Sequence, residues 1–250
     1  MKLTFLGTGD VRQVPVYGCR CRACEAARKD ARLRRRPCSA LLEVGDQRIL
    51  IDGGLTDLAE RFAPGDLNAI LLTHYHVDHV QGLFHLRWGL NDSIPVYGPD
   101  DRDGCADLLK HPGILEFHPP LLPCVPFTLG EVQITPLPLQ HSKPTFGYLF
   151  EQGDRCIAYL TDTVGLPETT EAWLRRYENL EMVIDCSQPP RPEPPRNHND
   201  LNLVLDIHQR LRPQCTWLTH IGHEMDQWLQ DHALPEAVRV ARDGQLLMSE

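Results

Sequence analysis

One short stretch constrains this sequence more than any other: residues 73–79, with the sequence Thr-His-Tyr-His-Val-Asp-His. It follows the apolar run 70–72, which is typical of a buried strand, and it precedes residues 80–88, which predict the opening of a helix. Three histidines and one aspartate therefore lie on a loop between a strand end and a helix start. Functional side chains often lie on such loops because a rigid scaffold orients them.

The spacing in this loop favours metal binding over simple helix capping. His74 and His76 are two residues apart, so an extended backbone directs both side chains to one side. Asp78 and His79 are adjacent and must diverge, which suits a second ion beside the first. Imidazole nitrogens and carboxylate oxygens suit zinc, manganese or iron. An aspartate that only caps a helix would not need three neighbouring histidines.

The pattern H-x-H-x-D-H resembles the signature of the metallo-β-lactamase superfamily of dinuclear hydrolases. The resemblance implies an α/β fold, a four-layer αβ/βα sandwich with the site in the cleft between its two sheets. A chain of 250 residues has an ordinary length for one such layered domain. We therefore expect a single metallo-β-lactamase-like domain over residues 1–250, with a zinc-binding cysteine insertion at about 19–38.

Three later apolar runs also end at a side chain that can bind a metal, namely His141, Asp162 and His220. Sites in layered α/β folds form at strand ends, so the repeated position supports a shared site. The resemblance implies how the ligands divide, with Asp162 bridging both ions and Asp52 fixing a histidine tautomer behind them. The remaining ligands would be His74, His76 and His141 for the first ion, and Asp78, His79 and His220 for the second.

Three of the nine cysteines form a separate candidate site. Cys19, Cys21 and Cys24 have the spacing C-x-C-x2-C, which lets three thiolates reach one ion, and a structural zinc needs four ligands. Either His223 or Cys38 can be the fourth ligand, and we favour His223. The odd total argues against a disulfide framework. The remaining cysteines are expected to be small buried side chains: Cys105, Cys124, Cys156, Cys186 and Cys215.

Composition excludes several classes of partner. The net charge of −9 argues against nonspecific nucleic-acid binding, and no apolar run approaches the ~20 residues of a membrane span. Residues 1–7 predict a first strand and not a secretion signal, so we expect a cytoplasmic protein. We also expect a homodimer. The arginine-rich residues after the cysteines could form a solvated face, a phosphate patch or an interface, of which we favour the first.

Elsewhere, residue patterns predict individual elements. Residues 3–6, 40–44 and 48–51 predict strands of a first sheet, and the prolines of 113–129 predict loops and edge strands. A helix is predicted over 167–177, with acidic residues first and basic residues last. Other helices are predicted over 56–62, 201–211 and 225–231, and Asn199 or Asp200 can cap the one over 201–211.

Further stretches resemble one family within the superfamily, the cyclic phosphodiesterases of the carbon–phosphorus lyase pathway. They are, besides the cysteine cluster, residues 35–39, 72–76, 81–84, 95–99, 137–139, 141–143, 146–148 and 185–187. The resemblance implies a phosphonate-catabolism enzyme that hydrolyses 5-phospho-α-D-ribosyl 1,2-cyclic phosphate to ribose 1,5-bisphosphate. It also implies two divalent ions at the active site, manganese or zinc, and one structural zinc.

The same family places a catalytic histidine at His198, beside a proline-rich loop. We expect His198 to donate a proton to the leaving sugar oxygen, and Asp78 to serve in catalysis as well as in metal binding. Three basic side chains are candidates for binding the 5-phosphate of the substrate: Lys143, Arg191 and Arg196.

Other functions share parts of this pattern. A tRNA 3′-end endonuclease has the same metal signature but would need a basic RNA-binding extension. A thioesterase or lactonase of the superfamily is a second alternative. A non-hydrolytic di-iron redox protein is the least favoured, because such relatives carry Glu at the position of His76.

Overall fold

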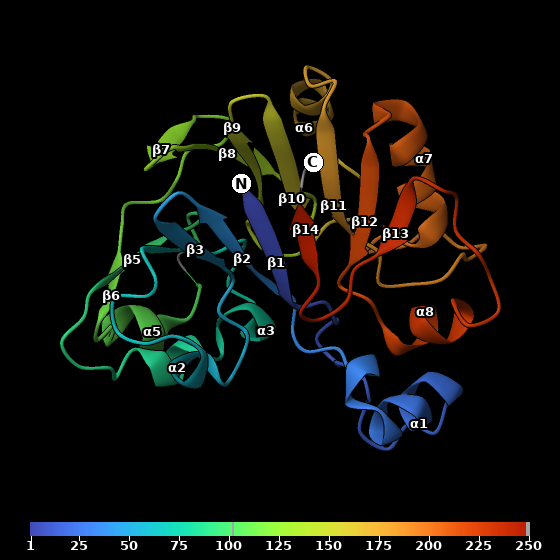
Figure 1. Ribbon diagram of the computed structural model, residues 1–250, viewed down its shortest axis with the longest axis horizontal. Coiled ribbons are helices and arrows are strands. Elements are labelled where there is room, and N and C mark those ends of the chain that lie inside the picture. Colours follow the sequence, from blue (N-terminus) through green and yellow to red (C-terminus); the bar gives the residue numbers. More distant parts are fainter. Residues whose placement is uncertain (102, 249–250) are drawn as a thin grey trace.

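The computed structural model describes residues 1–101 and 103–248, and its strands form two sheets of seven (Figure 1). The first sheet contains, in spatial order, β14 (Leu246–Met248), β1 (Lys2–Gly7), β2 (Ser39–Val44), β3 (Gln47–Ile51), β4 (Ala69–Leu71), β5 (Ile94–Tyr97) and β6 (Leu115–Phe117). The second contains β13 (Val238–Val240), β12 (Cys215–Thr219), β11 (Leu180–Asp185), β10 (Arg155–Leu160), β9 (Phe146–Gln152), β8 (Val132–Pro138) and β7 (Phe127–Leu129).

The helices are shorter than the sequence pattern predicts. They are α1 (Arg22–Lys29), the 3₁₀ turn η1 (Ala31–Leu33), α2 (Leu58–Arg61), α3 (Val77–Val80), α4 (Leu83–Leu86), α5 (Ala106–Lys110), α6 (Glu168–Leu174), α7 (Leu201–Leu211) and α8 (His223–Trp228). The run 80–88 contains the last residue of α3 and the four-residue α4, and α6 stops three residues before the predicted end. The prediction for α7 is confirmed, and the Asp200 carboxylate caps it by accepting a hydrogen bond from the Leu203 amide.

Successive side chains of a strand point to opposite faces of its sheet, and this alternation explains the layers. In β10, Ile157 and Tyr159 lie in the hydrophobic cluster shared by the two sheets, whereas Ala158 and Leu160 pack with residues of α6 and α7. A third cluster joins the outer face of the first sheet to α2, α4 and α5. Figure 1 shows α2 and α5 on one side of the sheets and α7 and α8 on the other. The predicted four-layer αβ/βα sandwich is thus confirmed.

The edges of both sheets are built from short strands. β14 and β6 bound the first sheet, β13 and β7 bound the second, and each of these is three residues long. The proline-rich residues 113–129 supply two of them, as predicted, because proline cannot donate a hydrogen bond to an inner ladder.

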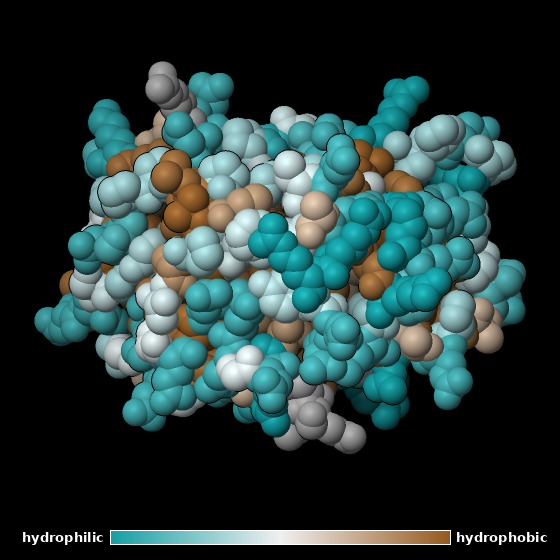
Figure 2. All heavy atoms as spheres, turned by 90° about the horizontal axis from the view of Figure 1, so that it is seen from above, coloured by the Kyte–Doolittle hydropathy of each residue, from teal (hydrophilic) through white to brown (hydrophobic). Residues whose placement is uncertain are grey.

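One face of the molecule is mainly polar. The face seen in Figure 2 is largely hydrophilic, with hydrophobic side chains in small separate patches. Within residues 1–101 and 103–248, every helix is too short or too polar to cross a bilayer.

Candidate metal centre

The predicted ligands come together where strands of both sheets end. His74 follows β4, His141 follows β8, Asp162 follows β10 and His220 follows β12, while Asp78 and His79 lie in α3. Long segments of chain separate these residues in the sequence. The packing of the two sheets against each other brings their side chains together.

The first predicted set forms a compact group with one carboxylate. The Nδ1 atom of His76 is 2.9 Å from the Nε2 atom of His74 and 3.1 Å from the Nε2 atom of His141. The Oδ2 atom of Asp162 is 3.7 and 3.8 Å from the same two Nε2 atoms. Four tetrahedral ligands held about 2.1 Å from one ion would be about 3.4 Å apart, so these separations suit a metal.

The second predicted set lies beside the first. The Nε2 atoms of His79 and His220 are 3.4 and 3.8 Å from Oδ2 of Asp78. Asp162 reaches this set as well, with Oδ2 3.4 Å from Nε2 of His79 and Oδ1 3.3 Å from Nε2 of His220. The Asp162 carboxylate thus lies near nitrogens of both predicted sets, the position that a bridging ligand needs.

Each histidine presents one ring nitrogen to the cluster and the other to a protein oxygen. Such partners fix the ring orientation of metal ligands. The oxygens are Oγ1 of Thr73 at 3.0 Å for His74, Oγ of Ser142 at 3.5 Å for His76, Oδ2 of Asp52 at 2.7 Å for His79, the carbonyl of Asn197 at 3.1 Å for His141, and Oγ of Ser187 at 2.9 Å for His220.

Two buried nitrogens support the presence of a cation. The Nε2 atoms of His79 and His220 have no hydrogen-bond partner among the described residues, although both side chains are buried. Buried polar atoms are almost always paired, and metal coordination would pair these two. The His/Asp cluster therefore fits a dinuclear metal site.

The electrostatics of the cluster also favour positive charge. Burial opposes ionisation of Asp162, but charge on His220 and His79 outweighs it and holds the pKa of Asp162 well below its usual range. Burial likewise opposes protonation of His220, but Asp162 and Asp78 raise the pKa of His220 to about 10. Divalent ions would replace protons in neutralising the carboxylates.

His198 lies between the two sets. Its ring centroid is 5.1 Å from that of His141 and 4.7 Å from that of His220. Its Nδ1 atom is 2.7 Å from Oδ2 of Asp185. Burial disfavours the imidazolium, but the Asp185 carboxylate outweighs burial and raises the pKa of His198. This arrangement keeps a proton available beside the metal ligands.

Sequence reasoning missed Asp185. The residue ends β11, so it has the same strand-end position as the predicted ligands. Its carboxylate is fully buried and also accepts hydrogen bonds from the Thr163 amide and the Ser187 hydroxyl. The strand-end rule, applied to every strand, would have found it.

The three candidate phosphate-binding residues are dispersed. Lys143 is two residues from His141, and its ammonium group donates to Asp101 at 2.8 Å. Arg191 pairs with Glu224 on the surface, and Arg196 is exposed. Lys143 is thus the candidate nearest to the predicted ligands in sequence, and the roles of all three stay predictions.

Comparison with known proteins identifies the family. The model of the beta-lactamase superfamily domain matches residues 47–221, which include every predicted ligand of the dinuclear site. This chain belongs to the metallo-β-lactamase superfamily. Its His/Asp cluster has the residue types and separations of a dinuclear metal site.

Individual relatives of this metallo-β-lactamase protein differ in their names. An octanoyltransferase of Porphyromonas gingivalis is 34% identical over 98% of this chain and 51% of its own length. A ribonuclease Z of Pyrococcus horikoshii is 25% identical over 62% of this chain and 49% of its own. The chain thus spans about half of these curated relatives. The crystal structure of a diphosphatase from the PhnP family matches with a TM-score of 0.82 and 26% identity, over 98% of this chain and 96% of that one.

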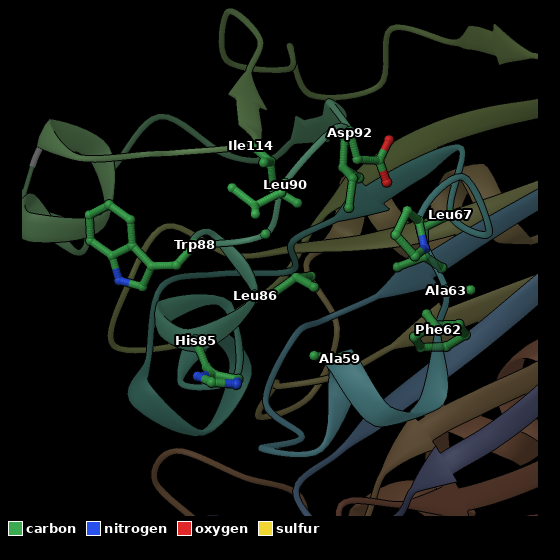
Figure 3. Close-up of a pocket in the computed structure, with 13 residues that line it drawn as sticks. Ala59, Phe62, Ala63, Leu67, His85, Leu86, Trp88, Leu90, Asp92 and Ile114 are labelled. Carbon is green, nitrogen blue, oxygen red and sulfur yellow. The ribbon is translucent and has the colours of Figure 1, made fainter.

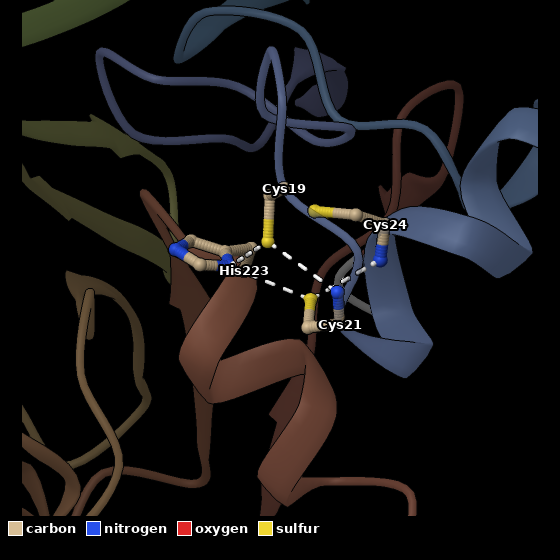
Figure 4. Close-up of side chains that lie close together, drawn as sticks. All are labelled: Cys19, Cys21, Cys24 and His223. Carbon is tan, nitrogen blue, oxygen red and sulfur yellow. Dashed lines mark hydrogen bonds between the residues drawn. The ribbon is translucent and has the colours of Figure 1, made fainter.

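This metallo-β-lactamase domain also carries the cysteine cluster, which Figure 4 shows. The Nδ1 atom of His223 is 3.4 Å from Sγ of Cys19 and 3.5 Å from Sγ of Cys21, and Cys24 lies in the same group. Four such ligands could hold a structural zinc. Cys38, the alternative fourth ligand, lies elsewhere: its thiol is buried between the sheets, 3.2 Å from the hydroxyl of Tyr159.

Two other predictions can be compared with the structure of this metallo-β-lactamase protein. Cys156, Cys186 and Cys215 are buried as expected, but Cys105 and Cys124 are partly exposed, because each lies in a loop. Three of the basic side chains after the cysteines pair with acidic groups on the surface, as the solvated-face interpretation expects: Arg28 with Glu25, Arg32 with Asp30, and Arg36 with Asp57. Arg35 departs from it, because this side chain is buried and pairs with Asp226.

A separate apolar pocket lies in the outer helical layer of the first sheet (Figure 3). It has a volume of about 230 Å³, and none of its lining residues is a predicted metal ligand. Its lining is mainly hydrophobic and includes Phe62, Leu67, Leu86, Trp88, Leu90 and Ile114. This pocket is therefore distinct from the metal centre.

Proposed function

We propose that this protein is a PhnP-type cyclic phosphodiesterase. The substrate would be 5-phospho-α-D-ribosyl 1,2-cyclic phosphate, and the product would be ribose 1,5-bisphosphate, formed during phosphonate catabolism. The proposal is supported by the short motifs along the chain, by the cysteine cluster and by the likeness to a PhnP-family diphosphatase over nearly the whole chain.

The observation that carries the proposal is the position of His198. Phosphodiester hydrolysis must protonate an alkoxide as it leaves, and a positioned acid can do so. Asp185 holds the Nδ1 side of the ring, so the Nε2 side remains available to donate. The ring lies against one histidine of each metal set, His141 and His220.

The chain's own residues would divide the work of the reaction. When bound, the two ions would polarise the phosphoryl oxygens and lower the pKa of an attacking water. His74, His76 and His141 would hold one ion, Asp78, His79 and His220 the other, and Asp162 both. Positioning of the phosphate between these groups and the proton from His198 would then supply most of the rate acceleration.

A second phosphate would need a cation away from the metals. Lys143 is the strongest of the three candidates, because it lies two residues beyond His141 and about a quarter of its side chain is exposed. Arg191 and Arg196, on the proline-rich loop that leads to His198, would approach from the other side. The proposal also implies the partners of the protein. It would bind a small anionic substrate, and neither nucleic acid nor a membrane. The protein itself would be a homodimer in the cytoplasm.

A substrate panel tests the proposal. The purified protein, loaded with manganese or zinc, would be assayed on the ribosyl cyclic phosphate, a precursor tRNA, an octanoyl thioester and a simple diphosphate ester. We expect the cyclic phosphate to have the highest kcat/KM. A higher value for the tRNA would favour the endonuclease alternative, and a higher value for the thioester would favour the thioesterase alternative.

A further inference from the structure

The two candidate metal sites are joined by a very short piece of chain. His220 follows β12 and His223 begins α8, so only Ile221 and Gly222 separate a ligand of the dinuclear centre from a ligand of the cysteine cluster. If the backbone of one of these histidines moves, only these two residues can change conformation to keep the other in place. We propose that the zinc site of Cys19, Cys21, Cys24 and His223 positions His220 and thereby sets the affinity of the second active-site metal.

The backbone of His220 needs external support. Its φ angle is +55°, in the left-handed region that side chains with a Cβ disfavour. Two contacts hold it in place: the Ile221 amide donates a hydrogen bond to the Thr8 carbonyl at 2.8 Å, and Oγ of Ser187 lies 2.8 Å from the His220 carbonyl oxygen. After Gly222, the chain enters α8, whose first residue is the zinc ligand His223.

The segment that carries the three cysteines buries few hydrophobic side chains. α1 is eight residues long, and the buried hydrophobic cluster beneath it contains only Val14, Cys24 and Ala27. An isolated helix of this length is marginal in water. Bound zinc would tie this segment to His223 and hold the start of α8 in place. The ion pair between Arg35 and Asp226 anchors α8 farther along, at 2.6 Å, but not at its first residue.

The proposal predicts an asymmetric effect. His220 belongs only to the second set, with Asp78 and His79, whereas the first set has no ligand near the cysteine cluster in sequence. Loss of zinc should therefore weaken the second active-site metal and leave the first nearly unchanged. A general loss of stability would weaken both. The proposal depends on the assignment of the two metal sets and not on the identity of the substrate.

The test measures metal binding without substrate. Wild type, His223→Ala and His223→Cys would be loaded with cobalt, whose thiolate bands report the cysteine cluster and whose weaker visible bands report the dinuclear centre. Competition with a chelator then gives the affinity of each ion. Cysteine is a suitable rescue residue because His223 faces the thiols with Nδ1, the ring nitrogen nearer to its backbone.

We expect His223→Ala to lose the thiolate bands and to bind the second active-site ion at least tenfold more weakly, and His223→Cys to restore both. A matched control is Leu108→Ala, at a fully buried residue of α5 that belongs to neither candidate site and whose truncation lowers stability in general. An unchanged affinity for the second active-site ion in His223→Ala would overturn the proposal. So would weakening by the same factor at both active-site ions in His223→Ala, as expected for Leu108→Ala.

A second measurement uses the unaltered chain in case the alanine variant does not fold. Cys19 and Cys21 are partly exposed, so an organomercurial reagent can remove zinc from the wild-type protein. Selective weakening of the second active-site ion after this treatment would support the proposal. Unchanged affinity would overturn it, as would a wild-type protein that binds no metal at the cysteines.

Discussion

The dinuclear centre and the cysteine cluster are both groups of potential metal ligands, but the protein supports them in opposite ways. The ligands of the first lie at the ends of strands in a packed sandwich, and each ring has a second protein partner. The cysteines lie on a loop and an eight-residue helix with little buried surface. In the first case the fold sets the positions of the ligands before an ion binds. In the second case a bound ion would itself contribute to the fold.

The largest effect should come from the residue shared by both active-site ions. Asp162→Ala removes the carboxylate that faces both sets, so we expect metal content and phosphodiesterase activity to fall together, the activity to background. Metal analysis and turnover of the cyclic phosphate check this. Because the sheets hold the remaining ligands, the variant should still melt cooperatively. A variant with full metal content and normal turnover would show that Asp162 does not bridge.

The next largest effect should separate chemistry from metal binding. His198→Ala should lower kcat by about 10²–10⁴-fold, the usual contribution of a positioned acid, with both ions retained. The loss should shrink for a nitrophenyl phosphodiester, whose leaving oxygen needs no proton. His232→Ala serves as the control, because this exposed histidine follows α8 in the chain and belongs to neither candidate site. Release of an ion from His198→Ala would instead make this residue a ligand.

A smaller effect should follow from changing a residue behind the ligands. Asp52→Asn keeps the shape of the side chain but weakens its hydrogen bond to Nδ1 of His79. Removing such a partner typically costs about 10–100-fold in metal affinity. Chelator competition would measure the loss, with Asp57→Asn on the surface as the matched control. Unchanged affinity in Asp52→Asn would mean that the strand end alone orients His79.

The smallest effect on chemistry should come from the cysteines. Cys21→Ser should release about one zinc per chain and lower the Tm, by about 2–4 °C for each kcal/mol of stability lost. Zinc analysis and thermal melting check both expectations, and Cys105→Ser is a control outside the cluster. If Cys38→Ser released zinc and His223→Ala did not, the fourth ligand would have to be reassigned to Cys38.

Sequence patterns predicted the site better than they predicted the helices. Each of His74, Asp162 and His220 follows an apolar strand and a threonine, which is a local pattern. The packing of the two sheets then places these three side chains close together. Helix lengths depend instead on packing, and α6 ends at Leu174, where the exposed residues Arg175 and Arg176 begin. The ion pair of Lys143 with Asp101 joins residues 42 positions apart, and no local pattern signals such a contact.

The three-residue edge strands affect how the molecule can associate with itself. A strand of this length exposes about 10 Å of unpaired backbone, too little to template a stable cross-molecule ladder. Self-association of the native protein, including the expected homodimer, must then use side-chain surfaces and not shared sheets. The same feature should keep the folded protein soluble at high concentration, and heat-induced aggregation would have to begin with the longer inner strands, after the sandwich opens.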